Sequence, residues 1–138
     1  WIHDGWISLM LSAFSRCVLV REALVDYRQH PAQKVGACRR EQLKQLTWQR
    51  RMNREFFTRE AARWADAYAF LREKKHLMRR VSDLELVRRR AILDRDRLAL
   101  RLDPSQRWHL VSEHLMAGDY DRYAWGAISA AVDLIWHE

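Results

Sequence analysis

Glycine, proline and cysteine are all scarce in this chain of 138 residues. It contains four glycines and two prolines, and because these residues mark most turns, we expect helices joined by few connections. The two cysteines, Cys17 and Cys38, are too few for a disulfide framework or a metal site. Cys17 lies in an apolar run and Cys38 lies beside Arg39 and Arg40. The sequence therefore predicts reduced thiols in a cytoplasmic protein.

The chain also lacks an apolar run long enough to span a membrane. It is rich in apolar residues, at 49% with seven tryptophans, which is enough for one core. It is also basic, with a formal net charge of +7 and a pI of about 10.0. This charge favours an anionic partner, and nucleic acid, a phosphorylated substrate and an acidic membrane surface all qualify.

The first 36 residues carry the sharpest pattern. Two polar clusters, Trp1–Trp6 and Tyr27–His30, flank an apolar helix expected over about Gly5–Phe14 and a β-branched run, Cys17–Val20, expected to form a covered strand. Asp4 can cap that helix. Because Pro31 disfavours the helical region at the preceding residue, an ordered loop is expected next. Trp1 begins the sequence within what reads as a core element, so we expect further chain before it.

The rest of the chain predicts four helices. The second starts at a capping-box pattern, Ser82 to Glu85, the third starts at Asp103-Pro104, and Gly118 ends the third. Their expected ranges are residues 39–71, 82–102, 103–118 and 121–136.

The motifs of the first 36 residues follow one another in the order HDGW, an apolar helix, CVLV, EALVDYRQH and then Gly36. In this order they resemble the end of the catalytic domain of family 2 glycosyltransferases. These are inverting enzymes of the GT-A type, and the likeness is to bacterial rhamnosyltransferase-like members. Residues 118–134 loosely resemble the tail that often follows. The implied fold is mostly α, with a short α/β remnant of a GT-A domain at residues 1–38 and a helical C-terminal extension at residues 39–138.

The resemblance implies a fragment of an enzyme that transfers a sugar from a nucleotide-sugar donor to a saccharide or lipid-linked acceptor, with inversion, in cell-surface polysaccharide synthesis. The fragment alone should be inactive. Asp4 matches the general base, and His30 lies where it could approach the metal and the donor diphosphate. A divalent metal, Mg or Mn, would be held mainly by upstream residues. The substrate-binding residues expected by the same likeness are His3, Trp6, Tyr27 and Arg28.

Simpler interpretations of these residues stay open. Asp4 could serve only as a helix cap, Trp6 as a core aromatic and His30 as an ordinary loop histidine. Asp94-Arg95-Asp96 has the spacing of a metal motif, but it lies in an arginine-rich helix and reads as a solvated face. His109, Glu113 and His114 do not have the spacing of a zinc helix.

The arginines between Arg39 and Arg101 lie among acidic residues, which favours a solvated face with many ion pairs. Peripheral docking on the anionic inner face of the plasma membrane is a second interpretation, since it would suit a lipid-linked acceptor. Nucleic-acid binding is disfavoured, because no helix-turn-helix or RNA-binding motif is present. The competing class of protein is a non-enzymatic basic helical module that binds nucleic acid or a protein partner.

Overall fold

The computed structural model describes residues 3–18, 20–22 and 52–135. This part of the chain is helical, as the sequence predicts, and contains no strand. The helices are α1 (His3–Phe14), α3 (Arg54–Glu73), α4 (Asp83–Leu102), α5 (Arg107–Met116), α6 (Asp119–Tyr123) and α7 (Gly126–Ile135), with the 3₁₀ turns η1 (Lys75–Leu77) and η2 (Pro104–Gln106).

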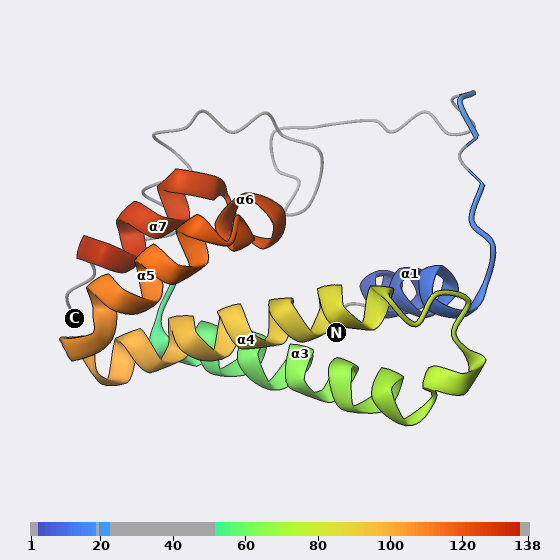
Figure 1. The fold of residues 1–138 in the computed structure, drawn as a ribbon, viewed down its shortest axis with the longest axis horizontal. Helices are drawn as coiled ribbons and strands as arrows, with labels where there is room; N and C mark the ends of the chain where they lie inside the picture. The colour runs from blue at the N-terminus through green and yellow to red at the C-terminus, as the bar shows by residue number, and fades with distance from the viewer. Residues whose placement is uncertain (1–2, 19, 23–51, 136–138) are drawn as a thin grey trace, which may run out of the picture.

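The two longest helices, α3 and α4, form an antiparallel hairpin through η1 (Figure 1). Helix α1 lies against the connected end of this hairpin, where the backbone N–H of Arg79 donates to the carbonyl of Ala13 at 3.1 Å. The short helices α5, α6 and α7 gather over the far half of α4 (Figure 1). Helix α4 is therefore the element that both ends of the described structure share.

The buried apolar residues form two clusters along α4. One joins α1 to the hairpin through Ala13, Leu71 and Val87, with Trp6 packed against it. The other joins α4 to α5, α6 and α7 and is made by Leu93, Leu100, Val111, Tyr120 and Ala130. Each cluster supplies apolar burial that an isolated helix could not obtain.

Local signals set several helix boundaries. Asp103 accepts a hydrogen bond from the backbone N–H of Ser105 at 2.9 Å ahead of Pro104, as the sequence predicts. Gly118 adopts a φ of 71° just past the end of α5, a conformation that glycine reaches at little cost. Helix α4 begins at Asp83, but the Ser82 side chain makes no capping hydrogen bond. The predicted capping box is therefore not formed.

Three predicted elements differ in the structure. The first is the strand over Cys17–Val20, whose described residues are not in a strand, and Val18 is 77% exposed. A β-branched run needs a hydrogen-bonding neighbour to become a strand, and the described residues provide none.

The other two differences are helix breaks. The helix expected over residues 39–71 is interrupted at Met52 and Asn53, and α3 begins at Arg54, where the Asn53 side chain accepts from the backbone N–H of Phe56 at 3.0 Å. Residues 39–51 lie outside the described residues. The last predicted helix is split into α6 and α7 at Ala124 and Trp125, since Gly126 takes a φ of 57°.

Candidate functional site

His3 and Asp4 lie together in the first turn of α1. The Nε2 of His3 lies 2.7 Å from Oδ1 of Asp4, and the two side chains are 83% and 76% exposed. Because α1 already includes His3, Asp4 is not its cap, and the capping interpretation of this residue is wrong. The pair leaves the carboxylate open to a molecule in solution.

Trp6 lies one turn along α1 and is half-buried. Its ring packs edge-on against Phe70 of α3, with 5.5 Å between the ring centroids. It helps hold α1 to the hairpin, which agrees with its interpretation as a core aromatic. The other three predicted site residues, Tyr27, Arg28 and His30, lie outside the described residues.

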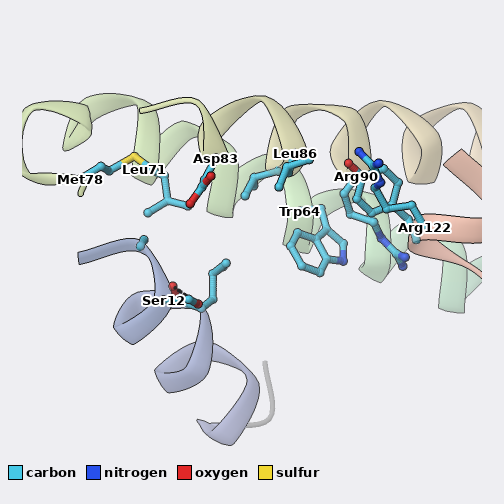
Figure 2. Close-up of a pocket in the computed structure, with 12 residues that line it drawn as sticks. Ser12, Trp64, Leu71, Met78, Asp83, Leu86, Arg90 and Arg122 are labelled. Atoms are coloured by element: carbon cyan, nitrogen blue, oxygen red, sulfur yellow. Dashed lines mark hydrogen bonds between the residues drawn. The ribbon is translucent and has the colours of Figure 1, made fainter. Parts of the chain in front are cut away.

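A hollow of about 420 Å³ lies between α1 and the α3–α4 hairpin. Figure 2 shows α1 on one side and the side chains of α3 and α4 on the other, with Leu71 and Met78 toward one end and Arg90 and Arg122 toward the other. The apolar part of its wall is made by Leu9, Ala13, Trp64, Leu71, Met78, Leu86 and Val87. This volume falls in the range of small-molecule sites, roughly 300–1,000 Å³.

A second hollow, of about 480 Å³, lies at the C-terminal end of α1. Its charged lining is Arg16, Arg79, Arg80 and Asp83, accompanied by Ser12, Ser15 and Cys17. Three arginines against one carboxylate give this hollow a positive charge. Ser12 and Asp83 line both hollows, so the two adjoin.

The arginines of α4 differ from those at the end of α1, because each has a carboxylate partner. The pairs are Arg88–Glu85, Arg89–Asp119, Arg90–Asp94, Arg95–Asp96, Arg97–Asp133 and Arg101–Asp133. Arg88 and Arg95 lie on a solvated face, as predicted. Asp94, Asp96, Arg97 and Arg101 are buried, so the solvated-face prediction is wrong for them. The neighbouring helices cover these four residues.

Asp133 of α7 is the centre of one buried network. It is fully buried, and it accepts hydrogen bonds from Arg97 Nε at 2.7 Å, Arg101 Nη2 at 2.5 Å and the Tyr120 hydroxyl at 2.9 Å. The Arg101 guanidinium lies 3.6 Å from the centroid of the Phe57 ring. Burial, together with the neighbouring Asp133 carboxylate, raises the pKa of Tyr120, which keeps its hydroxyl a donor.

His114 of α5 is the centre of a second network. Its Nδ1 lies 2.9 Å from Asp119 Oδ2 and its Nε2 lies 3.1 Å from Asp96 Oδ2. Burial opposes protonation of the imidazole, but the two carboxylates outweigh it and raise the pKa of His114. Burial alone would raise the pKa values of Asp96 and Asp119, but their charged partners outweigh it. His114 and Arg95 lower the pKa of Asp96, and Arg89 and His114 lower the pKa of Asp119.

Sequence reasoning did not select Asp133, Tyr120 or Asp119 as members of a buried network. A signal was available, since Asp133 is the one charged residue in the apolar segment GAISAAVDLI. Arg97 and Arg101 are also four apart, so they share one face of α4. A lone buried carboxylate needs such partners.

Within the described ranges, no group of three or more His, Cys, Asp or Glu residues could hold a metal ion. His114 does not offer a free ring nitrogen, since both face carboxylates. None of the described helices combines the length and the apolar character needed to cross a bilayer. The sequence matches no protein-family model, and no curated protein or solved structure matches it.

Proposed function

We propose that this chain is the C-terminal part of an inverting glycosyltransferase, with Asp4 as the general base for the acceptor hydroxyl. The likeness of the HDGW and EALVDYRQH segments to family 2 glycosyltransferases supports the class of enzyme. The observation that carries the role of Asp4 is its exposed carboxylate, paired with His3 in the first turn of α1. A base must be reachable by the hydroxyl that it deprotonates.

In the proposed reaction, the Asp4 carboxylate accepts the proton of the acceptor hydroxyl. The acceptor oxygen forms a bond to the anomeric carbon of the donor sugar, on the face opposite the leaving group. The bond from that carbon to the diphosphate breaks, and the nucleoside diphosphate leaves with the electron pair. Configuration at the anomeric carbon is inverted, and His3 holds the carboxylate in place.

Helix α1 provides a rigid support for this base. Its far end is tied to the hairpin by the hydrogen bond between Arg79 and Ala13, and its middle is tied by the contact of Trp6 with Phe70. A general base acts efficiently only when it is held close to the productive geometry. We propose that the helical extension positions α1 in this way.

The described residues do not fit a divalent cation, because they offer no cluster of ligands. No step of the proposed reaction is therefore routed through a metal on these helices. The Mg or Mn ion implied by the family resemblance, and the donor itself, belong in the proposal to residues outside the described ranges. We further propose a cytoplasmic enzyme at the inner face of the plasma membrane, where a lipid-linked acceptor would be found.

The test is Asp4→Asn in the intact protein that contains this chain. Because Asp4 does not cap α1, the variant should stay folded, and kcat should fall by about 100- to 10,000-fold with donor KM little changed. Asp66→Asn, an exposed carboxylate on α3, is the matched control. A transfer assay with donor titration, accompanied by thermal melts, measures both. Normal turnover by Asp4→Asn would overturn the assignment of the base.

A further inference from the structure

The two hollows adjoin at Ser12 and Asp83, which line both, and we call them together the α1 groove. Its apolar hollow is bounded by Leu9, Leu71 and Leu86 among others, and its basic hollow by Arg16, Arg79 and Arg80. Ser12 lies at the junction of the two. An apolar hollow that adjoins a cluster of cations matches a ligand with an apolar chain and an anionic head.

The charge in the basic hollow is not offset in the way that the charge of α4 is. Every arginine of α4 is paired with a carboxylate, whereas the basic hollow sets three arginines against Asp83 alone. Arginine forks bind phosphate through two parallel hydrogen bonds. This composition favours a phosphate over a neutral head group.

The opposite end of the apolar hollow is a poorer place for an anion. Arg90 and Arg122 line that end, but the Arg90 Nε already donates to Asp94 Oδ2 at 2.6 Å, and its guanidinium lies 5.3 Å from the centroid of the Trp64 ring. The charge of Arg90 is therefore engaged within the protein, and Arg122 is a single further arginine against the three of the basic hollow. The ligand orientation that follows places the head group beside Arg79 and Arg80 and the chain beneath α1.

We propose that the α1 groove binds a single-chain lipid phosphate, with the chain in the apolar hollow and the phosphate on Arg16, Arg79 and Arg80. This inference rests on the proposed function, because it names the lipid that carries the acceptor saccharide. The phosphate site and Asp4 lie at opposite ends of α1, about 15 Å apart along the axis at 1.5 Å per residue from Asp4 to Phe14. The saccharide of a bound acceptor must therefore extend along α1 to reach the base.

Binding can be measured with dodecyl phosphate below its micellar concentration, by calorimetry on the intact protein. We expect saturable binding with one site per chain. Dodecyl maltoside, which has the same chain and a neutral head, should bind at least about tenfold more weakly, as should inorganic phosphate, because each engages only one half of the groove. Equal binding of dodecyl maltoside would overturn the role of the arginines, and equal binding of inorganic phosphate would overturn that of the apolar hollow.

Two pairs of variants locate the site. Arg79→Ala with Arg80→Ala should weaken dodecyl phosphate binding by about tenfold or more. Arg54→Ala with Arg59→Ala removes the same charge from an exposed part of α3 and should leave binding unchanged. Ser12→Trp should fill the junction of the hollows and abolish binding. Ser12→Ala removes only the hydroxyl and should leave binding unchanged. The proposed site would be overturned if the Arg54/Arg59 double variant lost as much binding as the Arg79/Arg80 double variant, or if Ser12→Ala lost as much as Ser12→Trp.

Binding to phosphatidylglycerol vesicles distinguishes a specific site in the groove from a general electrostatic attraction to anionic membranes. If the protein binds these vesicles but not monomeric dodecyl phosphate, and both arginine pairs matter equally, the charge acts as a diffuse surface and the groove proposal fails. Failure of the groove is distinguishable from failure of the proposed function. Asp4→Asn should abolish transfer while leaving dodecyl phosphate binding intact, because Asp4 lines neither hollow.

Discussion

The Nε of Arg97 on α4 donates a hydrogen bond of 2.7 Å to Oδ2 of Asp133 on α7, across 36 residues of sequence. Both side chains are buried, and Arg101 reaches the same carboxylate from the next turn of α4. The contact fixes how the C-terminal helices sit on the hairpin. Removing one member of such a buried group leaves the others charged and unpaired, which is costly.

Asp133→Asn should therefore destabilise the protein strongly. Arg97 and Arg101 would lose their shared carboxylate inside the core, and breaking a buried pair in this way typically costs about 3–5 kcal/mol. Urea unfolding monitored by circular dichroism measures the loss. Asp66→Asn, on the exposed face of α3, should change the free energy of unfolding by less than about 0.5 kcal/mol. A loss of similar size in both variants would contradict this account of the network.

Tyr120→Phe and Tyr123→Phe should differ, although each removes one buried hydroxyl. The Tyr120 hydroxyl donates to Asp133, so its loss should cost about 1.5–3 kcal/mol, the range for a hydrogen bond to a charged group. The Tyr123 hydroxyl has no hydrogen-bond partner among the described residues, so its removal should be neutral or slightly stabilising. Thermal melts of the two variants compare them directly, and equal melting temperatures would contradict the prediction.

Stability should depend on pH through His114. The pKa of His114 is raised in the folded state, so its protonated form stabilises the fold below its unfolded pKa of about 6.5, and this contribution is lost as pH rises through the folded value. The pKa values of Asp96 and Asp119 are lowered, so their contribution is lost as pH falls below about 4. The network should stabilise most between these limits.

Melting temperatures recorded from pH 4 to pH 9 test this dependence. His114→Gln should melt lower and lose most of the decline above pH 6.5, because Gln carries no titrating charge between Asp96 and Asp119. The exposed His109, in the same helix, provides the control, and His109→Gln should keep the wild-type profile. An unchanged alkaline decline in His114→Gln would assign the pH dependence to other groups.

The helix caps offer a prediction of smaller size. Asn53→Ala should cost about 1 kcal/mol, because the Asn53 side chain accepts from the backbone N–H of Phe56 at the start of α3. Ser82→Ala should cost little, since the Ser82 side chain makes no capping hydrogen bond. Asn53→Asp should restore the cap. Chemical denaturation resolves the difference, and an equal effect of the two alanine variants would contradict it.

The features of the fold that could be predicted from the sequence were those set by residues close to one another in the chain. The breaks at Asp103-Pro104 and Gly118 follow from residues within one turn of each other, and the structure confirms them. The start of α4 lies where it was predicted, but the capping box from which it was predicted is not formed. The strand over Cys17–Val20 was wrong because a strand needs a neighbour that the local sequence does not specify. The split between α6 and α7 was missed because alanines suit a continuous helix on either side of Gly126.

The candidate site likewise combines residues that are neighbours in the sequence with residues that only packing brings together. His3 was expected to bind substrate, and its contact with Asp4 was seen only in the structure, whereas the role of Asp4 as a base stays a proposal. The α1 groove could not be predicted, because Ser12, Leu71 and Arg79 come together only when α1 packs on the hairpin. Side chains this far apart in sequence are united by packing that no local pattern encodes.

By itself, the sequence determined that the chain would be helical, basic and divided by a few strong stop signals, because these follow from backbone propensity and composition. Only the tertiary structure decided which charges are buried. Arg88 and Arg97 look alike in the sequence, yet one pairs with Glu85 at the surface and the other with Asp133 in the core. The difference arises because Arg97 lies against Phe57 of α3, Tyr120 of α6 and Asp133 of α7, and a buried arginine persists there only where a distant carboxylate offsets its loss of hydration.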